Sequence, residues 1–366
     1  MFIDLEYLLN LSAVPGVGPT RIRALVAHFK NVEDIFKSSS KVLCEVDGID
    51  IKTAHHIREY SDFQFGEQQV KKASQIDVEI ITFWDSRFPE NLKKIYDPPA
   101  FIFVKGELTA NDRFAIGMVG TRLPSSYGKI IAEKFSKELA QKGLTIVSGL
   151  ARGIDTTCHW AALQSGGRTF AVLGSGIDML YPAENSRLAE KIPSQGALIS
   201  EFCLGTGPDA VNFPRRNRII AGLSLGTVVI EAGIRSGALL TANYALEQNR
   251  EIFAVPGNIN SPKSYGANQL IKEGAKLVTS IEDILDELAP QLKHLLNRGD
   301  EDSREKLIDL SEPERTLLGL LSHEPIHIDK LSQLMGKSTA ETLSLLLPLE
   351  FKDLVKQLPG KMFVKA

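Results

Sequence analysis

The feature that most constrains the fold of this chain is a regular alternation of short apolar runs and helical segments between Phe114 and Leu288. The apolar runs are almost continuously hydrophobic, as is typical of strands that are buried on both faces of a sheet. Strands that are joined by helical crossovers run parallel to one another. We therefore predict a doubly wound α/β sheet, with strands at 115–119, 144–147, 169–173, 197–200, 227–230, 252–255 and 276–279.

Five of the predicted strands end in loops that are rich in glycine and small polar residues. Ligands of open α/β sheets bind at the carboxyl ends of the strands, where glycine lets the backbone come close and helix N-termini attract anions. Short loops between strands and helices favour glycine in any case, which accounts for one or two of the five. All five together predict an anion-binding crest, to which we assign Gly120, Thr121, Arg122, Gly149, Arg152, Gly153, Gly174, Ser175, Gly176, Ser236 and Gly237.

A second signal is the segment 212–218, whose sequence is Asn-Phe-Pro-Arg-Arg-Asn-Arg, immediately before an apolar helix at 219–223. The helix dipole disfavours arginine at a helix N-terminus, so a cluster there indicates an anionic ligand, with a solvated helix start as the alternative. Arginine forks grip phosphates, and an aromatic ring offers a face on which any base can stack. The predicted contact residues are Phe213, Arg215, Arg216, Asn217 and Arg218.

The N-terminal residues predict several short helices with a weak internal repeat. Gly16 and Gly18 precede one amphipathic helical pattern, and Gly48 precedes another. Both copies have the form of a helix-hairpin-helix turn, in which glycine permits a positive φ and the next helix begins with free N–H groups. Asp50 replaces the outer glycine of the second copy and would repel a phosphate. DNA contact therefore fits the first turn better than the second, and plain packing of two helical hairpins stays an equal alternative.

The segments on either side of the alternating region predict two strands, a linker and a further small domain. Short apolar strands are expected at 78–83 and 101–104. Near the C-terminus, three helices and a final hairpin predict a winged helix. Its helix at 340–349 has no Lys or Arg, so groove recognition of duplex DNA is not expected, while weak backbone contact through the following lysines and protein contact both stay open. The predicted divisions are a helical domain at 1–73, the α/β domain at 74–288, a linker at 289–306 and the winged helix at 307–366.

The composition of the 366 residues excludes several classes of protein. The formal charge is −3, from 42 Lys and Arg against 45 Asp and Glu, which argues against a polybasic DNA coat but not against a local basic site. No apolar run approaches the roughly 20 residues of a membrane span, and the layout of a signal peptide is missing. The three cysteines are far apart and predict neither disulfides nor a metal site. We expect a cytoplasmic protein with no membrane partner, no metal and no cofactor.

Taken together, the motifs of the α/β region resemble those of the bacterial DNA-processing protein A (DprA/Smf) family. The similarity runs from about residue 84 to 288, with the motifs in the order and spacing of that family. Thr121 stands where serine is more usual, which is a small departure. The motifs that carry the resemblance are 119–122, 148–155, 174–178 with Tyr181-Pro182, 213–220, 236–242 and 255–257.

The resemblance implies an extended Rossmann-like domain that forms a homodimer and binds single-stranded DNA. It also implies that the RecA recombinase is loaded onto incoming single-stranded DNA in natural transformation, helped by displacement of single-strand-binding protein. Carried over by position, Arg122 and Phe213 with its arginine run would contact the strand, and the glycine-rich loops would form a phosphate-binding floor. The family is not known for catalysis. The flanking parts would be a small all-α helix-hairpin-helix (SAM-like) domain and a C-terminal winged helix.

The competing hypothesis is an enzyme, a nucleotide-binding phosphoribohydrolase on the same type of sheet. Gly226-Thr227 and Glu231 loosely resemble a nucleoside-monophosphate site, although the denser proline-glycine run of that enzyme family is missing from the sequence. Asp155 and His159 lie one helical turn apart and could form a catalytic pair. Because no third group is near them in the sequence, hydrogen bonds that shape the loop are the favoured interpretation. We therefore expect a binding protein and not an enzyme.

Overall fold

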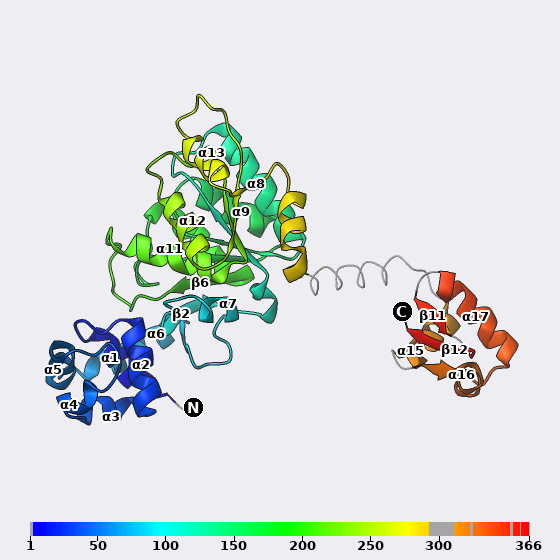
Figure 1. Cartoon of the computed structure of the whole chain (residues 1–366), viewed down its shortest axis with the longest axis horizontal. Helices are drawn as coiled ribbons and strands as arrows, with labels where there is room; N and C mark the ends of the chain where they lie inside the picture. Colours follow the sequence, from blue (N-terminus) through cyan, green and yellow to red (C-terminus); the bar gives the residue numbers. More distant parts are fainter. Residues whose placement is uncertain (1–2, 293–310, 323–324, 352–353, 359, 366) are drawn as a thin grey trace. The chain divides into compact units, whose positions relative to one another are not determined.

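The computed structural model describes residues 3–292, 311–322, 325–351, 354–358 and 360–365 (Figure 1). These residues belong to two compact units, 1–295 and 296–366. The first unit contains the N-terminal helices and the α/β sheet, and the second contains the C-terminal helices and hairpin. The predicted fold class is confirmed in its three parts, the helix-hairpin-helix region, the doubly wound sheet and the winged helix.

Six short helices form the N-terminal part of the first unit. Asp4 caps the first of them by accepting hydrogen bonds from the backbone N–H groups of the first turn. Gly16 and Gly48 have φ values of +83° and +80°, as the two hairpin turns require. The repeat in the sequence therefore corresponds to two helical hairpins. The helices are α1 (Leu5–Ala13), α2 (Pro19–Phe29), α3 (Val32–Lys37), α4 (Ser40–Leu43), α5 (Ile51–Glu59) and α6 (Gln64–Gln75).

One nine-stranded sheet forms the centre of the first unit, in the order β1-β2-β6-β5-β4-β3-β7-β8-β9. The strands from β3 to β9 pair in parallel, as predicted, whereas β1 and β2 pair antiparallel at one edge. All the predicted strands are present, with ends shifted by at most two residues. The strands are β1 (Glu79–Thr82), β2 (Phe101–Gly106), β3 (Ala115–Val119), β4 (Thr145–Ser148), β5 (Thr169–Val172), β6 (Gly196–Ser200), β7 (Gly226–Val229), β8 (Glu251–Ala254) and β9 (Lys276–Leu277).

Helices cover both faces of the sheet, and successive strand residues pack against opposite layers. Val228 belongs to the core beneath α8 (Ser126–Gln141) and α9 (Ile154–Gln164). Val229 belongs to the core beneath α11 (Asn212–Leu223), α12 (Gly237–Glu247) and α13 (Tyr265–Lys272). This double burial explains why the strands are continuously apolar. The shorter helices of this part are α7 (Glu90–Lys93), α10 (Ser186–Lys191) and the 3-10 turns η1 (Ala110–Arg113), η2 (Ala183–Asn185) and η3 (Ile192–Gln195).

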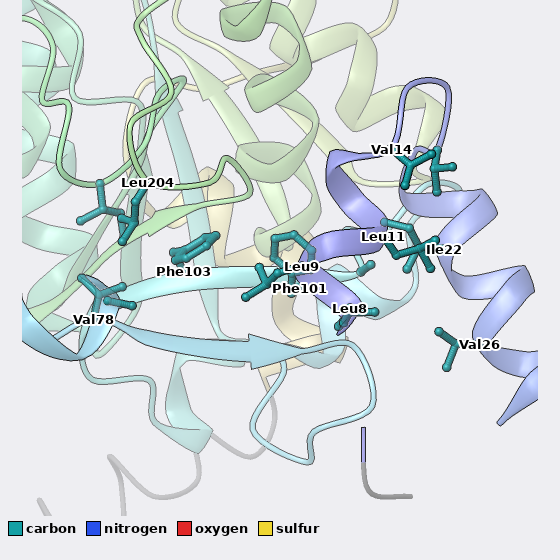
Figure 2. Packing of buried hydrophobic residues seen from close by; sticks show 14 of the residues in the cluster. Leu8, Leu9, Leu11, Val14, Ile22, Val26, Val78, Phe101, Phe103 and Leu204 are labelled. Atoms are coloured by element: carbon teal, nitrogen blue, oxygen red, sulfur yellow. The ribbon is translucent and has the colours of Figure 1, made fainter. Parts of the chain in front are cut away.

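The N-terminal helices share a hydrophobic core with the edge of the sheet. Figure 2 shows Leu9 of α1 beside Phe101 and Phe103 of β2, all of them buried. Polar contacts add to this packing, because the side-chain amide of Gln69 in α6 exchanges two hydrogen bonds with the backbone of Leu204. The antiparallel strands β1 and β2 therefore connect the helical part to the parallel sheet.

The C-terminal border of the α/β part differs from the prediction. The described chain is helical over residues 282–292, and the side chains of Leu288 and Leu292 are fully buried in the sheet core. Residues 289–292, which were expected to begin the linker, therefore pack with the α/β part because Leu292 continues its apolar pattern. The rest of the expected linker, 293–306, lies outside the described residues.

The second unit has the helix order and hairpin of a winged helix. Its small core includes Leu317, Leu331, Leu346 and Phe363. Gly336 ends the second helix in the left-handed conformation, which makes the turn before the third helix. The three strands are antiparallel in the order β10-β12-β11. The elements are α15 (Glu312–Leu320), β10 (Ile326–His327), α16 (Ile328–Met335), α17 (Thr339–Phe351), β11 (Val355–Leu358) and β12 (Met362–Lys365).

Candidate nucleic-acid interface

The candidate site lies at the point where the strand order reverses, between β3 and β7. From β3 the chain moves outward through β4, β5 and β6 and then returns to the other side of β3 as β7. The loops that follow β3 and β7 therefore diverge and leave a crevice, which is where open α/β sheets bind ligands. A groove of about 870 Å³ occupies this position. Of the predicted crest residues, Gly120, Thr121, Arg122, Ser236 and Gly237 line it.

One face of α11 forms a wall of the groove. Phe213, Arg216, Asn217 and Ile220 recur at intervals of three and four residues and all line the groove. The helix already begins at Asn212, so the predicted arginine run lies inside it and not ahead of it. Pro214 is tolerated because it falls in the first turn, where a backbone N–H has no partner in the helix. The helical phase thus decides which members of the run face the groove.

Arg216 is the charged residue at the centre of this wall, and it is buried. Its Nη1 atom donates a hydrogen bond of 2.7 Å to the carbonyl of Gly149 and another to the carbonyl of Val172. Burial lowers the pKa of the Arg216 guanidinium to about 10, opposed by the charge of Asp155 and assisted by that of Arg122. Arg216 therefore stays cationic at neutral pH and ties α11 to the ends of β4 and β5.

Asp155 and His159 shape the loop after β4. The Asp155 carboxylate accepts hydrogen bonds from the backbone N–H groups of Gly149 and Ala151, at 3.1 and 3.3 Å. His159 Nε2 accepts one from the N–H of Leu150, also at 3.3 Å. Burial raises the pKa of Asp155 to about 6 and lowers that of His159 to about 3. The interpretation that these two residues hold the loop is confirmed, and several of the loop's N–H groups are thereby used within the protein.

Gly153 shows why this loop must contain glycine. Its φ is +80°, and a Cβ atom there would lie 2.5 Å from the carbonyl oxygen of Thr121. The loop after β4 therefore packs directly against the loop after β3, which carries Arg122. Arg152 points to the surface, where its Nε lies 2.6 Å from the carboxylate of Glu184.

The aromatic rings of Phe213 and Tyr181 lie next to each other in the groove, and Arg122 lies beside the ring of Phe213. The ring of Phe213 lies 5.8 Å from that of Tyr181, at an angle of 50°. The Arg122 guanidinium is 5.8 Å from the centre of the Phe213 ring. Gly174 lies beneath that ring, because a Cβ added to it would be 2.8 Å from a Phe213 ring carbon. A stacking surface and a cation are thus adjacent.

Arg215 and Arg218 were expected at the site, and the structure places neither among the lining residues of the groove. Arg218 is buried and forms an ion pair with Glu201, and it also donates to the carbonyl of Asp97. Arg215 is exposed, with its guanidinium 5.4 Å from the centre of the Phe202 ring. The physical reason is the phase of α11, which turns positions 215 and 218 away from the face that carries Phe213.

The predicted loop after β5 also lies apart from the groove. Gly174, Ser175 and Gly176 are buried and line neither the groove nor the smaller recess beside it. The Ser175 hydroxyl donates to the carbonyl of Met179, and the N–H of Gly176 donates to the carbonyl of Thr206. Gly174 of this loop packs against the ring of Phe213, and residues 174–176 themselves are not exposed to a ligand in the groove.

Two side chains of the site were not predicted. Tyr181 lines both the groove and the recess, and Arg235 lines the groove after β7. In the described part of the chain, neither Arg122 nor Arg235 forms an ion pair with an acidic side chain. Arg235 could have been found, since it stands within one of the glycine-rich loops. Tyr181 lies on a loop after β5, so only the fold brings it to Phe213.

A model of the DNA recombination-mediator protein A family matches residues 79–289, more than half of the chain. This chain belongs to that family. A model of the DprA winged helix domain matches residues 301–361, and one of the SAM-like helix-hairpin-helix tandem matches 8–60. Protein Smf of Synechocystis is 34% identical over 98% of both chains. DNA processing protein DprA of Bacillus subtilis is 45% identical over 58% of this chain and 71% of its own length.

Solved structures of the family have the same fold. DNA processing protein A from Streptococcus pneumoniae matches with a TM-score of 0.67 and 36% identity, over 78% of this chain and 99% of its own. DNA processing protein A from Helicobacter pylori, described for a unique single-stranded DNA binding mode, matches with a TM-score of 0.53 and 26% identity, over 60% of this chain and 98% of its own. The resemblance found in the motifs is therefore confirmed.

Glu231, the residue on which the enzyme hypothesis depends, has a structural partner. It is buried, and its two carboxylate oxygens accept hydrogen bonds from the backbone N–H of Ser125 at 2.8 Å and from the Ser125 hydroxyl at 2.5 Å. Ser125 is the N-cap of α8, so this family member uses Glu231 to fix the start of that helix. The described residues contain no group of three or more His, Cys, Asp or Glu side chains that could hold a metal ion.

The two helix-hairpin-helix turns of this family member differ at the helix start. Gly18 precedes α2 and gives it no side-chain cap. Asp50 caps α5 by accepting from the N–H of Thr53 at 2.7 Å, and its carboxylate lies 3.5 Å from a guanidinium nitrogen of Arg21. The second turn thus already has a carboxylate where a phosphate would bind. None of the helices described here is long and apolar enough to cross a membrane.

Proposed function

We propose that this chain is a single-stranded DNA-binding recombination mediator, which loads a RecA recombinase onto incoming single-stranded DNA in natural transformation. The observation that carries the proposal is the groove between β3 and β7, where Arg122 lies beside the ring of Phe213, which contacts that of Tyr181, and where Arg235 also lines the groove; neither arginine is ion-paired within the described residues. Cations for the backbone and rings for the bases are what a protein needs to bind a single strand without reading its sequence. The single-stranded DNA binding described for the Helicobacter pylori relative supports it.

In the proposed complex, phosphates lie against the arginines and release their counterions. Arg122, in the loop after β3, and Arg235, in the loop after β7, contact the strand, and Arg216 supplies a fixed positive charge in the wall of the groove. One base stacks on Phe213, with Tyr181 as a second ring. Because the N–H groups of the loop after β4 are held by Asp155 and His159, arginine side chains carry most of the phosphate contact. Of the other predicted contacts, we retain Gly120, Thr121, Gly149, Arg152, Gly153, Asn217, Ser236 and Gly237 as residues that border the strand.

The proposal includes further features that the sequence predicts. The protein acts in the cytoplasm as a homodimer, contacts the recombinase and single-strand-binding protein, and catalyses no reaction. The helix-hairpin-helix part at 1–73 and the winged helix at 307–366 flank the strand-binding part, which was predicted at 74–288 and extends to residue 292, and the linker is the remainder, 293–306, of the predicted 289–306. Its net charge of −3 suits binding through one organised groove and not through general attraction to DNA.

The experiment that tests the function compares single-stranded and duplex oligonucleotides of equal length in equilibrium binding, with and without RecA. We expect clear preference for the single strand, and faster filament assembly by RecA on strands coated with single-strand-binding protein when the protein is present. Binding of the duplex as tightly as the single strand would contradict the groove assignment. Unchanged filament assembly would contradict the loading function alone.

A further inference from the structure

A second surface lies next to the groove, on the other side of the loop after β7. Strand β8 pairs with β7 on the side away from β3, so the loop after β8 lies next to the loop after β7. The two loops are in contact, because a Cβ atom added to Gly233 would lie 3.3 Å from the carbonyl oxygen of Pro262. The loop after β3 reaches the same place through α8, since the Tyr127 hydroxyl donates to the carbonyl of Pro256 at 3.0 Å. The groove therefore occupies only part of a longer edge, and residues 256–265 do not line it.

Large apolar side chains are exposed on this part of the edge. Leu123, Ile234 and Ile259 are 75%, 71% and 79% exposed, and Tyr127 is 45% exposed. Each of the four takes part in one of the two contacts just described or lies within four residues of one, and none of them lines the groove. Exposed apolar residues that cluster mark an interaction surface, whereas single ones need no explanation. We call these four residues the edge surface.

The edge surface belongs to segments that carry no negative charge. The chain has no Asp or Glu in residues 121–130, 232–240 and 256–266. The helix dipole favours acidic residues in the first turn of a helix. The three helices that begin in these segments, α8, α12 and α13, nevertheless have none there. The nearest carboxylate in the sequence, that of Glu231, is buried and bonded to Ser125.

Three cations belong to the same segments, namely Lys129, Arg235 and Lys263. Among the described residues, none of the three forms an ion pair with an acidic side chain. A surface that combines cations with exposed apolar side chains and has no carboxylate fits a polyanion that also presents flat apolar groups. A single DNA strand is such a molecule. A second copy of this chain fits poorly, because a symmetric contact would bring the same cations face to face.

We propose that the edge surface binds the continuation of the single strand beyond the groove. This inference rests on the proposed function, and it adds the loop after β8 to the strand-binding site. The strand leaves the groove at Arg235 and crosses the loop after β7. Its bases then lie on the apolar side chains of the edge surface and on the ring of Tyr127, and its phosphates lie against Lys129 and Lys263.

The test measures how affinity depends on the length of the strand. The full chain is titrated with oligothymidylates of about 4 to about 16 nucleotides, the range that single-strand sites cover. Strands that only fill the groove should bind the wild type and Tyr127→Ala equally. Strands that reach the edge surface should bind the wild type about tenfold more tightly than Tyr127→Ala, because the variant has no ring for a base. Tyr127→Phe keeps the ring and loses only the hydrogen bond to Pro256, so it should bind long strands like the wild type.

An added carboxylate gives a second, independent variant. Ile259→Asp places a negative charge in the edge surface and should weaken the binding of long strands severalfold, more at low salt than at high salt. Its matched control is Ile51→Asp, because Ile51 is also 79% exposed but lies in α5 of the N-terminal helices. Thermal unfolding checks that each variant folds, and if Tyr127→Ala does not, this second pair decides. Ultraviolet cross-linking should join Tyr127 to a long strand and not to one that only fills the groove.

The outcomes separate this inference from the proposed function. If short strands bind, and long strands bind the wild type, Tyr127→Ala and Ile259→Asp equally, the inference is overturned and the proposed function stands. The same holds if both variants lose a dimer in sedimentation while their affinity for long strands is unchanged, because the edge surface then binds a second copy. An equal loss of affinity in Tyr127→Phe and Tyr127→Ala would also overturn it, since the hydrogen bond and not the ring would matter. If no strand of any length binds, the proposed function is overturned and this inference with it.

Discussion

Two faces of the helix α11 use the same residue type in opposite ways. On the groove face, the Arg216 guanidinium lies beside Phe213, and one of its nitrogens has no hydrogen-bond acceptor among the described residues. On the face toward the N-terminal helices, Arg218 is buried in an ion pair with Glu201 and a hydrogen bond to Asp97. Asp97 in turn accepts a hydrogen bond from Thr20 of α2 at 2.7 Å. The comparison shows that the phase of the helix decides which arginines of the run face the groove and which stabilise the interior of the protein.

The largest effect that tests this division is on stability. Arg218→Ala leaves the buried carboxylate of Glu201 without its cation, so the free energy of unfolding should fall by about 3–5 kcal/mol. Arg215→Ala is the matched control, since Arg215 is exposed, and it should change the free energy by less than about 0.5 kcal/mol. Urea unfolding measures both. Equal stability of the two variants would contradict the supporting role of Arg218.

The next effect concerns the aromatic side of the groove. Phe213→Ala removes a stacking surface for one base, so affinity for a single strand should fall by about 1–3 kcal/mol. Tyr96→Ala serves as the control, because Tyr96 is 96% exposed and does not line the groove. Fluorescence anisotropy with a labelled oligothymidylate measures both affinities. If Phe213→Ala binds like the control, no base stacks on that ring.

A smaller effect concerns the cation beside the ring. Arg122→Ala should weaken single-strand binding by about 1 kcal/mol and lower the slope of log affinity against log salt concentration by about one. The control is Lys142→Ala, because Lys142 is an exposed cation at the far end of α8. Salt titrations of both variants give the slopes. An unchanged slope for Arg122→Ala would place the phosphate elsewhere.

The smallest effect is a pH dependence of the strand affinity, which originates from Asp155, the charged neighbour of Arg216. Burial raises the pKa of Asp155 to about 6, so the carboxyl becomes protonated as the pH falls through that value. The groove then loses the negative charge of Asp155, which lines it together with Arg216 and Arg122, and strand affinity should rise, by less than about tenfold, between pH 8 and 5.5. His159 stays neutral because its pKa is lowered to about 3, and Cys158 because burial raises its pKa to about 12.

Binding measured across this range in the wild type and in Asp155→Asn tests the assignment, with the variant expected to show a flatter profile. The same shift affects folding. Because the folded carboxyl binds its proton more tightly than the unfolded one, whose pKa is near 3.8, the free energy of unfolding should decrease as the pH rises from about 4 to 6. If the pH profile of strand affinity were identical in the wild type and in Asp155→Asn, the pH dependence would belong to another group.

The sequence could predict the sheet and the position of the groove, because these depend on local patterns. Apolar runs identify buried strands, and the glycines after β3 and β7 mark the edge where a ligand has access. The sequence could not show which arginines face the groove and which are buried, because the helix was expected to begin after Arg218 and in fact begins at Asn212. A start seven residues earlier turns part of a surface cluster into the interior of the unit.

Other parts of the site depend on contacts between distant segments. Tyr181 is brought to Phe213 by the packing of the β5 loop against α11. The partner of Glu231 is Ser125, more than a hundred residues earlier in the chain. Such pairs have no local signal in one sequence, so the sequence could suggest that Glu231 belongs to a nucleotide site but could not show that its oxygens are already bonded.

The most direct test of the central claim, that a single strand lies in the groove between β3 and β7, is to map where it can be cross-linked. Ultraviolet irradiation of the complex with oligothymidylate, followed by mass spectrometry of the peptides, identifies the side chains that stack on bases. We predict cross-links at Phe213 and Tyr181, with loss of the first in Phe213→Ala. Cross-links confined to the helix-hairpin-helix part at 8–60 or to the winged helix, with none in 115–257, would contradict the account.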